Sequence, residues 1–127
     1  MLIGFATPQT EAGTPPDEAA LVAMSKYNEE LQKAGVLLDL GGLTPTSRGA
    51  RVVYSGKQAR VIDGPFVESK ELIAGYLILE VKNLAEAIEW AKRAPFGVGS
   101  PDAMVELRPL YGAEDFDTAE ERAARKS

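Results

Sequence analysis

Hydrophobic and polar positions along the chain predict an alternation of strands and helices. Apolar residues are nearly continuous over residues 2–6, 36–40 and 73–81, and they alternate with polar residues over 103–110. Both patterns are typical of strands. Residues 51–54 and 58–62 flank the short polar segment 55–57 and predict a hairpin.

Two further segments have the period of a helix with one apolar face. In the first, apolar residues recur at spacings of four, three and four: Ala20, Met24, Tyr27 and Leu31. We expect Thr14 to cap this helix and Gly35 to end it. In the second, Asn83 is the expected N-cap, Glu86 completes a capping box and Pro95 ends the helix. Gly41 and Gly42 are expected to bend the chain after the strand at 36–40.

The predicted order is strand, helix, strand, hairpin, strand, helix, strand. This order is typical of an α+β domain, a two-layer sandwich of ferredoxin-like type. We assign it to residues 1–112, and we treat residues 113–127 as a charged C-terminal tail. The tail has almost no apolar face, so a frayed end and a segment packed on a partner both remain open.

Two helices can cover only one face of the predicted sheet. The strand at 73–81 is nevertheless apolar on both sides, with Tyr76 and Ile78 on the parity opposite Leu77 and Leu79. Strands that are buried on both faces have this pattern. We therefore expect a homodimer in which two sheets pack face to face as a dimeric α/β barrel. The alternative is a monomer that exposes Tyr76 and Ile78.

Composition narrows the chemistry. The 127 residues include no cysteine and no histidine, which excludes thiol nucleophiles, Ser-His-Asp triads and Cys/His zinc sites. With 14 basic and 19 acidic residues the net charge is −5, which argues against nonspecific nucleic-acid binding. No apolar run approaches the ~20 residues that span a bilayer. We recognise no phosphate loop or metal-spaced cluster in the sequence, and we expect no secretory leader. We expect a cytoplasmic protein without a metal or another cofactor.

The most specific motif is Asp63-Gly64-Pro65-Phe66 within the segment VIDGPFVESKELIAGY. With the flanking segments AGVLL, LAEAIEWAKRAP and VELRPLY, it resembles the signature of the DGPF-domain proteins, part of the YCII-related group. The resemblance covers roughly residues 1 to 111. It implies a bacterial protein with a ferredoxin-like fold and a dimeric barrel.

The resemblance implies less about activity than about the fold. Related YCII-type proteins use a His-Asp pair in a pocket, and some look like dehydrochlorinases or isomerases. This chain has no histidine, so that pair is not carried over. DGPF-type members often occur beside extracytoplasmic-function sigma factors, which implies a regulatory role as the alternative.

Several residues are candidates for a site. Asp63 suits a turn in which it accepts backbone N–H bonds, and a general base is the functional alternative. Arg108 is expected on the sheet face opposite Val105 and Leu107, where Glu106, Asp63 or an anionic ligand would satisfy it. Asp39 is on the strand parity opposite Leu38 and Leu40, so we expect it to enter a cleft on the same sheet face as Arg108.

The remaining candidates are Glu68, Lys70 and Tyr76. The first two fit a solvated loop or a polar rim that orients a ligand. Tyr76 fits interface packing or a ligand contact. The leading hypothesis is a homodimer that binds a small organic molecule, anionic in character, with Asp63 as base and Arg108 as anchor for isomerase- or lyase-like proton transfer. The alternative is a noncatalytic regulatory or interaction module associated with a sigma-factor system.

Overall fold

The computed structural model describes residues 1–67, 71–97, 103–116 and 123–124. It is a mixed α+β structure with antiparallel sheets. Four strands form the main sheet in the order β2-β5-β1-β6: β1 (Leu2–Phe5), β2 (Leu37–Gly42), β5 (Ile73–Leu79) and β6 (Val105–Leu107). All three strand pairs in this sheet are antiparallel.

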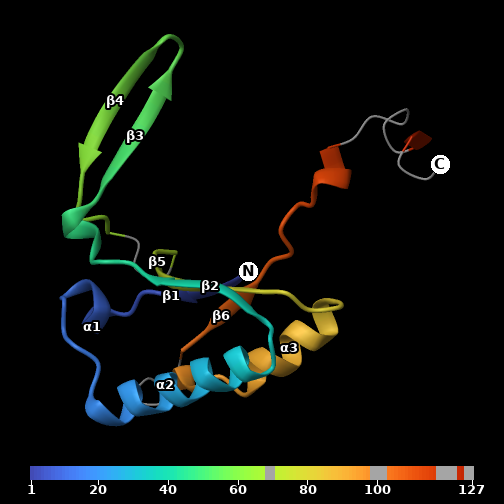
Figure 1. Ribbon diagram of the computed structural model, residues 1–127. Coiled ribbons are helices and arrows are strands. Elements are labelled where there is room, and N and C mark those ends of the chain that lie inside the picture. Colours follow the sequence, from blue (N-terminus) through green and yellow to red (C-terminus); the bar gives the residue numbers. More distant parts are fainter. Residues whose placement is uncertain (68–70, 98–102, 117–122, 125–127) are drawn as a thin grey trace.

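The two long helices, α2 (Glu18–Lys33) and α3 (Leu84–Lys92), lie together on one face of this sheet (Figure 1). Helix α2 begins at Asp17, whose carboxylate accepts the N–H of Ala20 at 2.7 Å. The prediction of Thr14 as the cap is therefore wrong, because the carboxylate of Asp17 already caps the first turn. Gly35 follows the helix with φ 71°, the left-handed conformation expected there.

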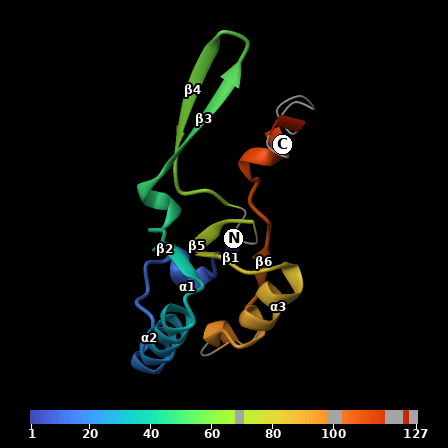
Figure 2. The ribbon, with the colours of Figure 1, turned by 45° about the vertical axis from the view of Figure 1, so that its right-hand side comes forward.

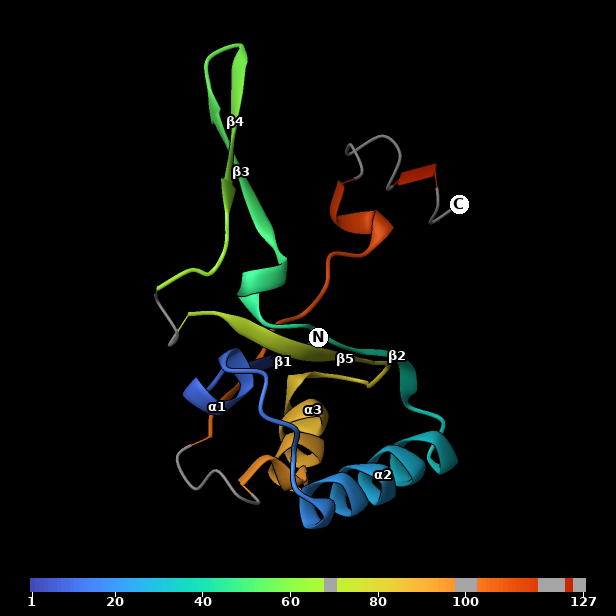
Figure 3. The same ribbon diagram turned by 90° about the vertical axis from the view of Figure 1, so that its left-hand side faces the viewer.

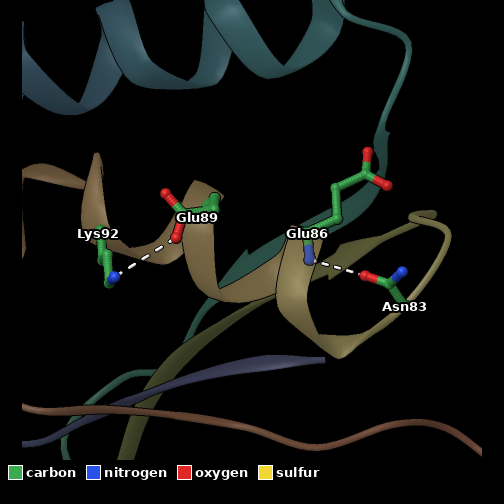
Figure 4. Close-up of polar contacts among 4 residues, drawn as sticks. All are labelled: Asn83, Glu86, Glu89 and Lys92. Atoms are coloured by element: carbon green, nitrogen blue, oxygen red, sulfur yellow. Dashed lines mark hydrogen bonds and ion pairs between the residues drawn. The ribbon is translucent and has the colours of Figure 1, made fainter.

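Helix α3 begins at the predicted cap. Asn83 Oδ1 accepts the N–H of Glu86 at 2.9 Å, and Lys92 pairs with Glu89 at 3.3 Å on the exposed side (Figure 4). The Glu86 carboxylate accepts the N–H of Lys82 at 2.9 Å, one residue earlier than a capping box requires. Two hydrogen bonds to side chains, one to Asn83 and one to Glu86, therefore stabilise the start of α3.

Short helical turns connect the larger elements. Helix α1 (Pro8–Glu11) follows β1 and is capped by a reciprocal pair of hydrogen bonds between Thr7 and Thr10. The 3₁₀ turns are Thr46–Arg48, Pro95–Gly97 and Ala113–Phe116. A four-residue helix leaves too little apolar periodicity to be distinguished from a loop by pattern alone.

The core lies between the helices and the sheet. Leu2, Leu31, Leu77 and Tyr27 are buried there. The Tyr27 hydroxyl donates to the carbonyl oxygen of Trp90 at 2.7 Å, which ties α2 to α3. Burial raises the pKa of the Tyr27 phenol above 10.0, and Glu30 adds to this, while Arg93 acts in the opposite direction.

The glycines at 41 and 42 continue β2 and do not bend the chain, which corrects the sequence-based expectation. Gly41 pairs with Tyr76 and Gly42 with Gly75 in β5. The ladder to β5 therefore holds both residues in the extended conformation.

The predicted hairpin is present as β3 (Ala50–Ser55) and β4 (Gln58–Asp63). It projects from the main sheet on the side opposite α2 and α3, as Figure 2 shows. The segment after β6 extends to that same side (Figure 3). These two segments stand beside a sheet face that no helix in the described ranges covers, and this face is called the open face below.

Candidate functional site

Strand register decides which side chains share the open face. Opposed residues of antiparallel strands point to the same side of a sheet. Two rows result, Gly41-Tyr76-Ile3-Glu106 and Asp39-Ile78-Met1-Arg108. The structure thus brings Asp39, Tyr76 and Arg108, three of the predicted site residues, onto one face.

Asp39 and Tyr76 form a pair at the β2 side of the open face. The Tyr76 hydroxyl donates to Asp39 Oδ2 at 3.5 Å, and Asp39 Oδ1 accepts the N–H of Leu40 at 2.8 Å. The Tyr76 ring lies over Gly41, where a Cβ would come within 2.7 Å of a ring carbon. A glycine at 41 therefore positions the phenol beside the carboxylate.

Arg108 lies at the β6 side of the same face. Its guanidinium pairs with Glu106 at 3.4 Å, with 70% and 46% of the two side chains exposed, so the arginine is not buried in a single chain. Val105 and Leu107 pack against the core, which confirms the predicted parity. Three strand spacings of roughly 4.8 Å each separate the β2 and β6 backbones, about 14 Å in all.

A pocket of about 380 Å³ opens at the Arg108 end of the sheet. Its charged lining residues are Arg108, Lys82 and Glu80. Its apolar walls include Leu38, Ile78, Leu107 and Leu110. An apolar pocket with a few polar groups on its lining is the usual form of a small-molecule site. Lys82 and Glu80 belong to no recognisable sequence motif. No sequence pattern indicates them, because they lie in the short connection between β5 and α3.

The DGPF segment anchors the hairpin. Thr46 Oγ1 accepts the N–H of Phe66 at 3.0 Å and donates to Glu11 Oε2 at 2.5 Å, while the Thr46 N–H donates to Glu11 Oε1 at 3.0 Å. A Cβ at Gly64 would collide with the carbonyl oxygen of Thr46. The Arg51 guanidinium stacks on the Phe66 ring, 3.9 Å from its centroid. Gly64 and Phe66 therefore have a structural role here.

Asp63 ends β4, opposite Ala50, and its side chain is exposed. Within the part of the chain that the structure describes, its carboxylate makes no hydrogen bond or ion pair, so neither the expected turn bonds nor a pair with Arg108 is formed. Asp63 does not line the Arg108 pocket. Glu68 and Lys70 lie outside the described residues.

Residues 1–67, 71–97, 103–116 and 123–124 contain neither a candidate metal site nor a candidate membrane-spanning helix. Acidic side chains do not gather there in a group that could hold a metal ion. None of the helices in these ranges is long and apolar enough to cross a membrane.

Comparison with known proteins identifies the family of the chain. The YCII-related domain matches residues 1–110 of the chain. The chain belongs to the YCII-related family. A relative from Rhizobium meliloti (strain 1021), "Uncharacterized protein R00369", is 30% identical over 94 residues, which cover 74% of this chain and 75% of the relative. The YCII-related match spans every strand of both sheets.

Proposed function

We propose that this YCII-related protein is a homodimer that binds a small organic anion at the open face, in the pocket beside Arg108. The observation that carries this proposal is the position of Arg108. It lies on the open face and lines an apolar pocket that also contains Lys82. A guanidinium at the edge of an apolar pocket is suited to bind a carboxylate through paired hydrogen bonds.

The hairpin supports the homodimer. Every residue of β3 and β4 is exposed in the single chain. Val52, Tyr54 and Val61 share one face of the hairpin and are 49%, 79% and 63% exposed. An isolated two-stranded hairpin is at best marginally stable in water. A second copy placed over the open face would cover these residues together with Tyr76 and Ile78.

The strand order supports the finer assignment of the fold. Counting only the main sheet, the first strand lies between the third and the fourth, and the second is at the edge beside the third. A ferredoxin-like fold would have this strand order, which supports our assignment, and face-to-face packing of two such sheets would give the dimeric barrel. We place one domain over residues 1–112 and a tail over residues 113–127, an assignment that the family match over residues 1–110 supports.

Proton transfer is the chemistry that this face would support. A carboxylate and a phenol lie side by side in the Asp39–Tyr76 pair, and a general base must reach the proton it removes within hydrogen-bonding distance. We therefore place a proton-accepting role on Asp39, with Tyr76 as its partner, toward a molecule bound at the β2 side of the open face. Arg108 has the anchoring role in its own pocket, about 14 Å across the sheet by strand spacing. The exposed hairpin position of Asp63 favours a structural role for that residue.

Binding of benzoate against benzamide tests the anionic class of ligand. These two molecules have nearly the same shape, and benzoate alone is charged. We expect the wild-type protein to bind benzoate roughly tenfold more tightly, since hydrogen bonds to charged groups contribute about 1.5–3 kcal/mol. Arg108→Met removes this preference, whereas the control Arg60→Met on the exposed hairpin leaves it unchanged. Equal binding of the two probes, or a preference that survives Arg108→Met, overturns the assignment.

A further inference from the structure

A second cavity lies on the helix-covered side of the main sheet, between the sheet and α2. Its volume is about 380 Å³. Met24 and Asn28 of α2 line it together with Leu2, Leu40, Leu77 and Phe96. Among the described residues, Leu2 lines both this cavity and the pocket described above, whereas Arg108 and Lys82 line only that pocket.

A row of glycines forms the floor of this cavity. Gly75 in β5 pairs with Gly42 in β2 and with Gly4 in β1, so three neighbouring strands carry no side chain at the same level. The next row is Leu40, Leu77 and Leu2, whose side chains belong to the helix-facing side. The missing side chains leave an empty space beside the core.

Glycine at these positions is not explained by close packing of the helix. A Cβ at Gly42 would have no neighbour within 4 Å, and one at Gly4 would make only ordinary contacts, at 3.8 Å or more. Gly42 and Gly4 also lack the positive φ that requires glycine. Only Gly75 is crowded, with its Cβ position 3.0 Å from the carbonyl oxygen of Gly41. The row therefore preserves space.

Asn28, which lines the cavity, carries a polar atom without a hydrogen-bond partner in the part of the chain that the structure describes. Its Oδ1 is buried and has no hydrogen-bond partner among the described residues. Buried polar atoms in folded proteins are nearly always hydrogen-bonded, and an exception calls for a specific cause. A ligand that donates a hydrogen bond would supply the missing partner.

We propose that this cavity binds a small, uncharged and largely apolar molecule with a single N–H or O–H group that donates to Asn28 Oδ1. The lining contains no charged residue, which excludes an ionic ligand. The volume is near the lower end of the range for small-molecule pockets and suits one or two fused rings. The glycine row receives the flat face of the molecule.

Indole and benzofuran test the proposal. They have the same bicyclic shape, but indole has an N–H donor where benzofuran has an oxygen. We expect indole to bind roughly fivefold or more tightly, the effect of about one hydrogen bond. Amide resonances in an NMR titration report the place directly, because those of Gly4, Gly42 and Gly75 shift with indole. Equal binding, a preference for benzofuran, or shifts confined to other residues overturns the proposal.

Variants of the cavity lining show whether the probes bind at this place. Asn28→Leu keeps the size of the side chain and makes the two probes bind equally. Gly42→Val fills the cavity from the sheet side and abolishes binding of both, while the control Gly49→Ala, outside the cavity, leaves binding intact. Arg108→Met also leaves indole binding unchanged, so the result is independent of the proposed anion site. Indole binding that persists in folded Gly42→Val protein overturns the proposal.

Discussion

Thr46 hydrogen-bonds the DGPF segment to helix α1 through its side-chain hydroxyl. Thr46→Val keeps the shape of the side chain and removes both hydrogen bonds of Oγ1, one to the Glu11 carboxylate and one from the Phe66 N–H. A bond to a charged group contributes about 1.5–3 kcal/mol and a neutral one about 1 kcal/mol. Both are partly buried, so water replaces some of each, and we expect a loss of about 2 kcal/mol.

Urea unfolding at one fixed protein concentration measures this loss, because the stability of an oligomer depends on concentration. Hydrogen exchange of the Phe66 amide measures the local effect, and we expect it to accelerate. Thr44→Val is the matched control, since Thr44 is exposed in the same loop, and it should change stability by less than about 0.5 kcal/mol. A Thr46→Val protein as stable as this control, with unchanged exchange at Phe66, would refute the anchoring role.

Three further predictions concern single features of the chain. Tyr27→Phe costs about 1 kcal/mol at neutral pH. Because burial raises the pKa of the phenol above 10.0, the stabilisation by Tyr27 is complete below that pH and is lost as the pH rises through the folded-state pKa, so urea melts of this variant should show a weaker alkaline decline. Asp63→Asn should change the free energy of unfolding by less than about 0.5 kcal/mol, and a loss of about 3 kcal/mol would instead indicate a buried ion pair. Truncation after Gly112 should leave the melting temperature within a few degrees of the full chain, and a large decrease would show that residues 113–127 pack on the core or on a partner.

The sequence predicts those parts of the fold that depend on local pattern. Asn83 and Gly35 carry the chemistry of a cap in their own side chain or backbone, and both predictions are confirmed. Pro15 follows Thr14, and a proline at the first helical position favours Thr14 as the N-cap of α2. Threonine and aspartate can both cap a helix, so the sequence alone does not decide between Thr14 and Asp17. Glycines at 41 and 42 suggest a bend because propensity is local, whereas pairing with β5 holds them extended.

The candidate site is predictable in part. Strand parity places Asp39, Tyr76 and Arg108 on the face opposite the helices. The Asp39–Tyr76 contact and the glycine row depend on register between strands that are distant in sequence, which no local pattern specifies. Asp63 is a candidate because it belongs to the DGPF motif. In the structure, Gly64 and Phe66 of this motif pack against and hydrogen-bond to Thr46, at the base of the hairpin.

A second copy of the chain is proposed to cover the open face. Sedimentation equilibrium at micromolar concentration measures this directly, and we expect a particle of twice the 13.6 kDa chain mass. Ile78→Asp places a charge in the proposed interface and should give the mass of one chain, while Val22→Asp on the exposed side of α2 should remain a dimer. A wild-type particle with the mass of one chain, or an Ile78→Asp protein that remains a dimer, would contradict the account.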